Sequence, residues 1–496
     1  MNVIIILMDT LRRDHLGIYG NRKIKTPSID NFAQRSTIFD QSYLGSYPCM
    51  PARQDLWTGR CNFPWRGWSP LEYDSKDIVA AVREQGYVTQ LITDHYHLWH
   101  WGSGNYHMNF NGVEFIRGQE SDSWNTDATI QIPWPTDKSK IMPIFDIYYR
   151  NTFHFKEEND YFSPRVFQSC INWIEKNHTH EKFFLMVDSF DPHEPWDTPE
   201  EYWRMYDPDY SGESYIWPPY GSADRYTAAE LKNIHARYCG EITLADKWFG
   251  KFIDKLDELG LFDNTMIVLT TDHGFLFGEH NYLGKHAPTL FEPISHTPLI
   301  IYHPHQRGAG RRVGSFAQLY DLYPTILEAI GANINPMEIH GHSLLPVISE
   351  TDIDTNAREA ICFGSFGGAI HLTDGEWTYV RSVTGTAPLY WHTQAHYAAN
   401  YWPREIKSNR MINLEQTKRN LAQWSHGSYL YSGKAGGETI NINEELYQVS
   451  MDPCQIQNVA SLYPNQCRIL SSKMKEFLNN IKAPESYLQW LALDMI

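Results

Sequence analysis

The feature that most constrains the fold is a set of short, almost wholly apolar segments that are followed closely by acidic residues. Residues 3–8 run directly into Asp9, residues 265–270 lead to Asp272, and residues 183–187 form a further run of the same kind. Such runs are typical of strands buried on both faces, as in parallel sheets covered by helices. Ligands of open α/β sheets gather at the carboxyl ends of the strands. The pattern therefore predicts an α/β fold with acidic side chains at one edge of its sheet.

Helical and strand patterns alternate along the first two thirds of the chain and then change. We predict helices over residues 77–85, 164–176, 228–259 and 322–330, and strands over 87–93 and 298–302. After about residue 355, short strands and turns dominate up to a closing helix over 468–481. We therefore predict a catalytic domain over residues 1–355 and a C-terminal subdomain over 356–496, with an inserted, aromatic-rich stretch near 392–429.

A cysteine near the start of the chain lies in an unusual setting. Cys49, Pro51 and Arg53 form a Cys-x-Pro-x-Arg pattern, followed by Thr-Gly-Arg over residues 58–60. Few helix breakers follow Pro51, so a helix is predicted to begin there, with Cys49 near its amino end. The partial positive charge of that end suits an anionic substrate and is expected to lower a thiol pKa. A lone cysteine is more often a buried structural residue, so this hypothesis depends on its companions.

Residues 49–53 resemble the signature of the type I sulfatases of the alkaline phosphatase superfamily, in which the cysteine is oxidised to Cα-formylglycine (3-oxoalanine). Segments 8–14, 26–30 and 445–460, and the Asp-His-Gly at 272–274, resemble the same family in the same order. The resemblance implies an alkaline-phosphatase-like α/β fold. This fold has a large, mixed but mostly parallel sheet sandwiched by helices and a smaller C-terminal α+β domain with an antiparallel sheet.

Acidic groups gathered at one sheet edge repel each other unless a cation holds them. The resemblance implies one divalent metal, with Asp9, Asp272, His273 and the residue formed from Cys49 as its ligands. Sites made only of oxygen ligands suit Ca²⁺, whereas a mixture of aspartate and histidine admits Mn²⁺. The sequence therefore leaves both Ca²⁺ and Mn²⁺ as candidates for the bound metal.

The resemblance also implies the roles of the catalytic residues. Arg53 is expected to stabilise the aldehyde hydrate, Lys285 to contact the sulfate group and His193 to assist the leaving group. His95 and His97 stand where the family usually has a Lys-x-His pair. In this chemistry one hydroxyl of the hydrate attacks sulfur and the alcohol leaves; the second hydroxyl then allows sulfate to be expelled without water attacking sulfur.

Two positions depart from the usual sulfatase pattern. Thr10 replaces the second acid of the first metal-binding pair, His273 replaces an asparagine in the second, and Asp14 is a candidate for the missing ligand. The phosphonate monoester hydrolase branch shares both departures. The predicted function is hydrolysis of aryl or carbohydrate sulfate monoesters, and the alternative is hydrolysis of phosphonate monoesters or phosphodiesters. The presence of Cys49 together with Lys285 argues against a catalytically inactive binding protein of the same fold.

The composition limits the partners. A net charge of -17 argues against nucleic acid and requires local positive groups for a small anionic sulfate-ester substrate. The seven cysteines have no paired spacing, which suggests neither a disulfide framework nor a zinc site. We find no leader-like or membrane-spanning segment and expect a cytoplasmic protein, with a formylglycine-generating maturation enzyme as its partner. Assembly into a homo-oligomer is an open expectation.

One loop is crowded with aromatic and histidine side chains. We predict that it forms a wall of the substrate pocket, where its rings stack on a sugar or aryl group; its members are Trp99, Trp101, His107 and Trp124.

Overall fold

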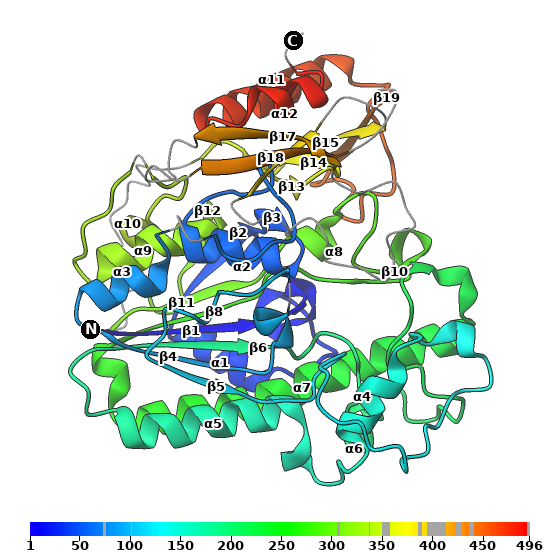
Figure 1. Ribbon diagram of the computed structural model, residues 1–496. Helices are drawn as coiled ribbons and strands as arrows, with labels where there is room; N and C mark the ends of the chain where they lie inside the picture. The colour runs from blue at the N-terminus through cyan, green and yellow to red at the C-terminus, as the bar shows by residue number, and fades with distance from the viewer. Residues whose placement is uncertain are drawn as a thin grey trace.

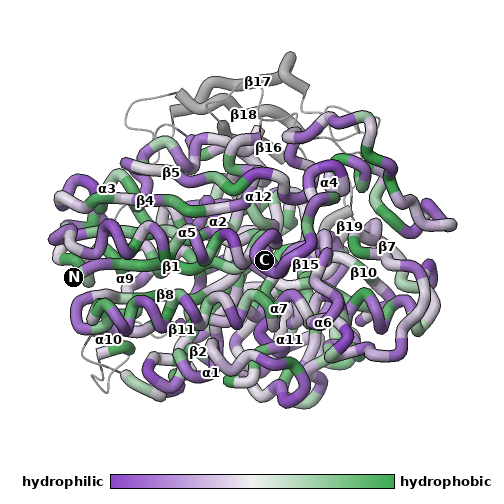
Figure 2. Tube along the Cα trace, turned by 90° about the horizontal axis from the view of Figure 1, so that it is seen from below, coloured by the Kyte–Doolittle hydropathy of each residue, from purple (hydrophilic) through white to green (hydrophobic). Residues whose placement is uncertain are grey.

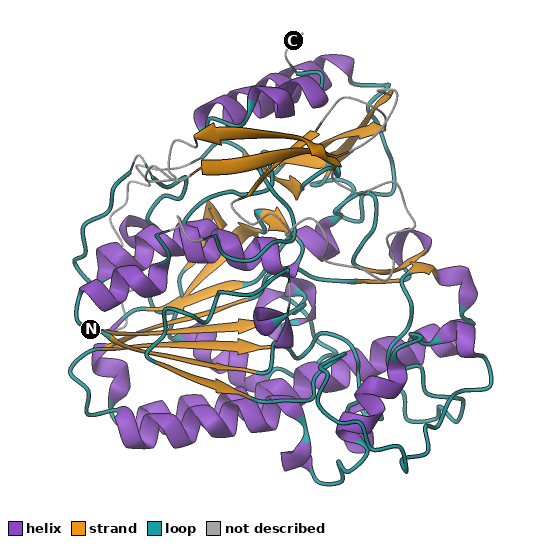
Figure 3. Cartoon of the chain, viewed as in Figure 1, coloured by secondary structure: helices purple, strands orange, loops and turns teal. Residues whose placement is uncertain are grey.

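The computed structural model describes residues 1–72, 76–100, 102–304, 308–336, 338–349, 358–384, 389–393, 413–421, 429–435 and 441–493. Its main feature is an eight-stranded sheet in the order β12-β2-β11-β8-β1-β6-β4-β5 (Figures 1 and 3). The strands are β1 (Asn2–Met8), β2 (Thr37–Tyr43), β4 (Val88–Thr93), β5 (Gly112–Phe115), β6 (Phe183–Ser189), β8 (Thr265–Thr270), β11 (Leu299–Tyr302) and β12 (Arg312–Gln318). Only β11 runs antiparallel to its neighbours in this sheet, which is therefore mixed and mostly parallel.

Helices cover both faces of this sheet (Figure 1). One layer contains α1 (Pro27–Gln34), α5 (Phe162–Asn177) and α7 (Ala228–Glu258), and the other contains α2 (Cys49–Thr58), α3 (Ile78–Glu84), α9 (Leu322–Ala329) and α10 (Leu345–Ile348). The connections carry α4 (Phe145–Thr152), α6 (Glu200–Trp203), α8 (Glu292–Ser295) and a small sheet of β7 (Gly221–Ser222), β10 (Tyr282–Gly284) and β9 (Leu276–Phe277).

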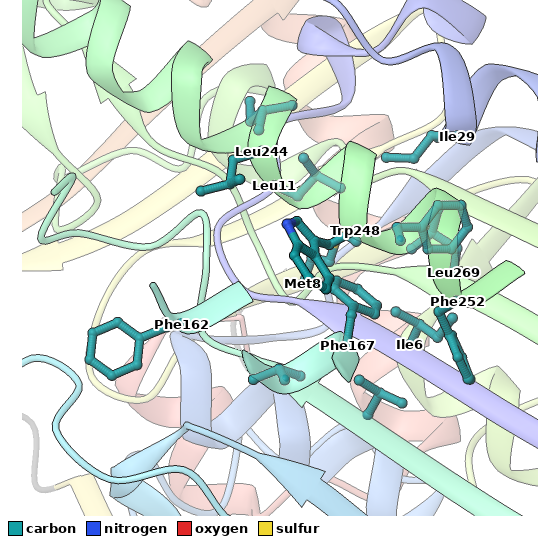
Figure 4. Close-up of a cluster of buried hydrophobic side chains, with 14 of the residues drawn as sticks. Ile6, Met8, Leu11, Ile29, Phe162, Phe167, Leu244, Trp248, Phe252 and Leu269 are labelled. Atoms are coloured by element: carbon teal, nitrogen blue, oxygen red, sulfur yellow. The ribbon is translucent and has the colours of Figure 1, made fainter. Parts of the chain in front are cut away.

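The apolar sequence of β1 explains why it is central. Its alternate side chains enter two different hydrophobic cores: Ile4, Ile6 and Met8 pack on the α5 and α7 side, and the residues between them on the α2 side. Figure 4 shows Ile6 and Met8 beside Phe167 and Trp248. In Figure 2 hydrophobic residues follow the strands, while hydrophilic and hydrophobic residues alternate along the covering helices. The apolar runs are thus buried on both faces, as the sequence predicts.

A second sheet belongs mainly to the C-terminal part and has the order β19-β15-β14-β13-β3. Its strands are β3 (Ser46–Tyr47), β13 (Ile361–Ser365), β14 (Ile370–Thr373), β15 (Trp377–Thr384) and β19 (Asn441–Gln448), with α11 (Pro464–Asn480) and α12 (Glu485–Trp490) packed against it. Strand β3 pairs in parallel with β13 and comes directly before the Cys49 segment. The C-terminal sheet therefore holds the chain that leads into α2.

The predicted α/β fold with a smaller antiparallel C-terminal sheet is confirmed, with two differences of detail. Helix α2 begins at Cys49 rather than after Pro51, because a proline in the first helical turn sacrifices no intrahelical N–H bond. Of the predicted insertion, residues 394–412 and 422–428 lie outside the described residues; the rest contributes to a three-stranded sheet of β16 (Leu389–Thr393), β18 (Tyr429–Ala435) and β17 (Asn413–Leu421). Within the described ranges no helix combines the length and apolarity needed to span a bilayer.

His371 on β14 joins the C-terminal sheet to the loop before α8. Its Nε2 atom accepts a hydrogen bond of 3.0 Å from the backbone N–H of Leu290, in the catalytic part, and its ring stacks on Phe363. Burial lowers the pKa of His371 to about 3, because the charged ring would lose its solvation and its acceptor lone pair.

We therefore expect acid to destabilise the protein partly through His371. The unfolded state takes up a proton at this residue below about pH 6.5, whereas the folded state does so only near pH 3. Stability from this group is thus present above pH 6.5 and falls as the pH drops, by at most about 1.4 kcal/mol per pH unit. Urea unfolding between pH 7.5 and 5.0 should show a shallower pH dependence for His371→Gln than for the wild type. The exposed control His180→Gln should keep the wild-type slope; equal slopes for all three proteins would contradict the assignment.

Candidate active site

Three acidic residues meet at the carboxyl ends of adjacent parallel strands. Asp9 follows β1 directly, Asp188 lies near the end of β6, and Asp272 comes two residues after β8. Strand β1 pairs with both of the others, so the three chain segments reach the same edge of the sheet. All three side chains are fully buried.

The turn after each strand fixes these acids. Thr10 adopts a left-handed backbone conformation with φ 64°, and its N–H donates to Oδ1 of Asp272 at 3.0 Å. A Cβ atom on Gly274 would lie 2.0 Å from the carbonyl oxygen of Pro293, so only glycine fits after His273. The glycine of the Asp-His-Gly pattern therefore has a steric cause in the folded structure.

Cys49, the first residue of α2, faces this group of acids. Its Sγ atom lies 3.1 Å from Nε2 of His273 and 3.5 Å from Nζ of Lys285. One ligand atom from each of Asp9, Cys49, Asp272 and His273 lies within 4.8 Å of the others. The structure thus brings together all four residues that the sequence suggests as metal ligands.

The expectation of a lowered thiol pKa is wrong for this structure. Burial, followed by the nearby carboxylate of Asp9, raises the pKa of the Cys49 thiol well above its ordinary value. These two effects outweigh the opposing charges of Lys285 and Arg53 and the partial charge of the helix terminus. An unmodified Cys49 is therefore a neutral thiol and a poor nucleophile near neutral pH.

Arg53 lies one turn along α2 and joins the three acids. Its Nε and Nη2 atoms donate to the two carboxylate oxygens of Asp188 at 2.8 and 2.6 Å. Nη1 donates to Asp272 at 2.8 Å and to the carbonyl oxygen of Cys49 at 3.2 Å, and Nη2 lies 3.1 Å from Asp9. The guanidinium, with no exposed surface, thus holds the strand ends and the start of α2 together.

The charge balance of this group fits a bound cation. Burial, with Asp272 close by, raises the pKa of Asp9 well above its ordinary value, although Arg53 and Lys285 oppose the shift. Among the described residues, Oδ2 of Asp9 accepts no hydrogen bond, although Nη2 of Arg53 lies 3.1 Å from it. Two carboxylates and an imidazole are also a suitable donor set for a divalent metal. The residues present therefore fit the divalent metal that sulfatases generally use.

The structure shows what Thr10 does in the place of the missing acid and whether Asp14 replaces that acid. The Thr10 hydroxyl donates to Oδ1 of Asp9 at 2.7 Å and so supports that carboxylate. The Asp14 carboxylate accepts two hydrogen bonds from Arg12 and one from His15, and it is not in the group of four. Asp14 therefore does not take the place of the missing ligand.

Lys285 and His193 form a hydrogen-bonded pair beside Cys49. Nδ1 of His193 lies 2.5 Å from the carbonyl oxygen of Glu194, so this nitrogen carries the proton and Nε2 accepts from Nζ of Lys285. Burial, with Lys285 next, lowers the pKa of His193 well below its ordinary value. Burial disfavours the charged amine, but Cys49, Glu194 and Asp9 raise the pKa of Lys285 above its usual value. The proton of the pair thus resides on Lys285.

The two histidines after β4 are both buried in this region. Nε2 of His95 lies 3.6 Å from Asp9, and neither ring nitrogen has a hydrogen-bond partner among the described residues. Nε2 of His97 lies 3.2 Å from the carboxylate of Glu120. Burial, followed by Arg53, lowers the pKa of His95 well below its ordinary value, and burial lowers that of His97 to about 4. Both rings are therefore neutral near pH 7.

The aromatic loop is only partly available to a ligand. Trp99 stacks on Phe115 and His107, with ring centroids 4.1 and 4.7 Å apart, so its ring packs within the protein. Trp124 is 45% exposed and lines a cavity together with Phe115 and Arg165. Trp101 lies outside the described residues. Stacking on a substrate ring therefore stays a prediction for Trp124 and for Trp101.

Sequence reasoning missed three charged residues of the site. Asp188 follows an apolar run as Asp9 does, so its position was a usable signal; it binds Arg53 through both oxygens. Glu194 lies 3.9 Å from Lys285, and Glu120 contacts His97. Neither glutamate stands at a strand end, and only the folded loops bring them here.

Comparisons with known proteins find relatives in both sequence and fold. The family model described as Sulfatase matches residues 1–332. Arylsulfatase K of Canis lupus familiaris is 23% identical over 529 residues, covering 99% of this chain and 84% of the relative. The phosphonate monoester hydrolase of Agrobacterium radiobacter has a TM-score of 0.70 at 21% identity, over 97% of this chain and 96% of that one. BT4656, solved with its substrate D-glucosamine-2-N,6-O-disulfate, has a TM-score of 0.69 at 16% identity, over 98% and 99%.

The matched family model covers two thirds of the chain, and the relative spans nearly all of it. The chain therefore belongs to the sulfatase family and is a sulfuric ester hydrolase.

Proposed function

We propose that this enzyme hydrolyses aryl or carbohydrate sulfate monoesters after Cys49 has been converted to formylglycine and one divalent metal, Ca²⁺ or Mn²⁺, has bound. The observation that carries the proposal is the convergence of Asp9, Cys49, Asp272 and His273 within 4.8 Å, with Lys285 3.5 Å from the thiol. The hydrated aldehyde would supply an oxygen nucleophile, and a bound divalent metal would supply Lewis-acid catalysis.

The residues of the chain have separate tasks in this proposal. Asp9, Asp272 and His273 hold the metal, and Arg53 keeps the acids and the start of α2 in their relative positions. Lys285 is protonated and is placed to neutralise the negative charge that develops on the sulfate oxygens. Burial strengthens that attraction, because little solvent screens the charge.

His193 is proposed to relay a proton to the departing alcohol. Its Nε2 accepts from Lys285, so the two residues together hold one transferable proton. In this relay Nε2 of His193 would take up the proton that it shares with Nζ of Lys285 and pass it to the leaving oxygen, so the alkoxide is neutralised as it forms and Lys285 is left neutral.

We expect the His193→Ala variant to distinguish substrates by their leaving groups. For an alkyl sulfate, whose alcohol needs a proton, kcat/KM should fall about 10²- to 10⁴-fold. For 4-nitrophenyl sulfate, whose leaving group is stable as an anion, the loss should be much smaller. The exposed His180→Ala variant serves as a control and should leave both values unchanged. Equal losses for the two substrates would show that His193 only positions its neighbours.

Two measurements test the proposed function itself. The mass of the Cys49 peptide, from protein co-expressed with a maturation enzyme, should lie about 18 Da below the thiol form, whereas ordinary thiol oxidation raises the mass. A panel of aryl sulfate, phenyl phosphonate and bis-aryl phosphodiester should then give the highest kcat/KM for the sulfate. The sulfate and the phosphodiester each carry one negative charge, so only the reaction rates separate the two functions.

The same panel examines the alternative. Thr10 and His273 follow the pattern of the phosphonate monoester hydrolase branch, and a hydrolase of that name shares the fold. A kcat/KM for the sulfate far below those of the other two esters would replace the proposal with this alternative. Chelation should abolish activity, and the comparison of Ca²⁺ with Mn²⁺ in restoring it identifies the metal.

A further inference from the structure

A second group of metal-ligating side chains lies outside the candidate active site, between the loop after β1 and helix α7. His15 ends a short 3-10 turn (Arg13–His15), and His235 and Cys239 stand four residues apart on α7. Residues with this spacing share one face of a helix. One ligand atom from each of the three residues lies within 4.8 Å of the others.

The contacts show that the ligand atoms face one another. Nε2 of His15 lies 2.7 Å from Nε2 of His235, which is 3.5 Å from Sγ of Cys239. Nδ1 of His15 lies 2.9 Å from Oδ1 of Asp14, so this nitrogen donates its proton to the carboxylate. Nε2 of His15 therefore directs a lone pair at the other two groups. A carboxylate behind a histidine in this way is usual where the ring binds a metal.

The surroundings favour a cation and allow it to enter. Arg12 pairs with both Asp14 and Glu279, so these three groups carry a net charge of minus one beside the cluster. Cys239 and His15 are buried, whereas His235 is partly exposed and opens the cluster to solvent.

We propose that His15, His235 and Cys239 form a binding site for one zinc ion, with Asp14 as a positioning residue and water completing a tetrahedron. Ordinary zinc–nitrogen and zinc–sulfur lengths require about 3.6 Å between nitrogen and sulfur, close to the 3.5 Å observed. They require about 3.3 Å between the nitrogens, so the two imidazoles separate by about 0.6 Å on binding. The Cys239 thiol becomes a thiolate and releases one proton to solvent.

Zinc at this position would fasten the loop after β1 to α7. The same two segments already meet through Tyr238, whose hydroxyl accepts from the N–H of Arg12 and donates to the carbonyl oxygen of Thr10. Thr10 in turn supports Asp9 and Asp272. The zinc site is structural and takes no part in the hydrolysis.

The test uses the full-length chain in a Cys49→Ala background, which removes the thiol of the candidate active site. Metal is stripped by chelation, and zinc, then separately cobalt(II), is titrated back. We expect a cobalt–thiolate charge-transfer absorption that disappears in Cys49→Ala/Cys239→Ser, together with the loss of one bound zinc per chain. Cys49→Ala/Cys170→Ser, which changes a buried cysteine of α5 that is in neither cluster, should keep both signals.

Two further variants keep the test decisive if Cys239→Ser disturbs folding. His235→Gln, at the partly exposed ligand, should also lose the bound zinc while its circular dichroism stays unchanged. Asp14→Asn should weaken zinc binding about 10- to 100-fold, as measured by competition with a chromophoric chelator. If the Cys49→Ala protein shows no thiolate absorption, or if His235→Gln binds as much zinc as its parent, the cluster is only a hydrogen-bonded histidine pair and the proposal fails.

Discussion

Replacement of Arg53 by alanine is expected to lower the free energy of unfolding by about 3–5 kcal/mol and to abolish sulfatase activity. The guanidinium makes charge-assisted contacts with three carboxylates, of Asp9, Asp188 and Asp272, and all four side chains are fully buried. Without it, the carboxylates are left together in a medium of low dielectric, where they must repel each other or take up protons. Urea unfolding at constant pH measures the loss of stability.

Two comparisons separate this effect from a general effect of removing an arginine. Arg83→Ala, at an exposed position on α3, should change the free energy of unfolding by no more than about 0.5 kcal/mol. Arg53→Lys keeps the charge but loses the two-pronged contact with Asp188, so its stability should lie between those of the wild type and Arg53→Ala. Wild-type stability of Arg53→Ala would mean that the acids are not charged together in the folded protein.

The Cys49→Ala variant is expected to lose kcat by roughly 10⁵- to 10⁶-fold, because the position that supplies the nucleophile is empty. The fold should survive, since the change removes a single sulfur atom next to polar groups rather than part of a hydrophobic core. The measurement is kcat for an aryl sulfate with enzyme matured in the presence of the formylglycine-generating partner.

The matched control is Cys170→Ala, another fully buried free cysteine, on α5. It should retain kcat within a few-fold, and its urea midpoint shows what the loss of a buried thiol does to stability alone. If Cys49→Ala were substantially more active than a mock preparation, Cys49 would not supply the nucleophile. The roles proposed for Lys285 and for the metal ligands beside Cys49 would then also be wrong.

The sequence was most informative where a residue pattern has one local cause. The apolar run of residues 3–8 can be buried only between two helical layers, and the structure places it there as β1. Because β1 and β8 are parallel neighbours, the residues that follow them, Asp9 and Asp272, lie at the same edge of the sheet.

The sequence was least informative where a contact joins distant segments. Nothing near Ser46 shows that β3 completes the C-terminal sheet, or that His371 accepts from Leu290. The spacing of the cysteines gave no sign of the proposed zinc site, because Cys239 is its one cysteine and His15 lies 220 residues before His235. The thiol pKa was misjudged because burial and the charge of Asp9 are properties of the fold, whereas the helix terminus is visible in the sequence.

The sequence alone determined the α/β class, the family and the residue types of the site, because strand burial and the chemistry of a motif depend on near neighbours in the chain. Only the tertiary structure decided that Arg53 links three acids, that Asp14 belongs to a different cluster from Asp9, and that Lys285 holds the proton it shares with His193. Those outcomes depend on distances between segments far apart in the chain, and electrostatic energies change steeply over such distances inside a protein.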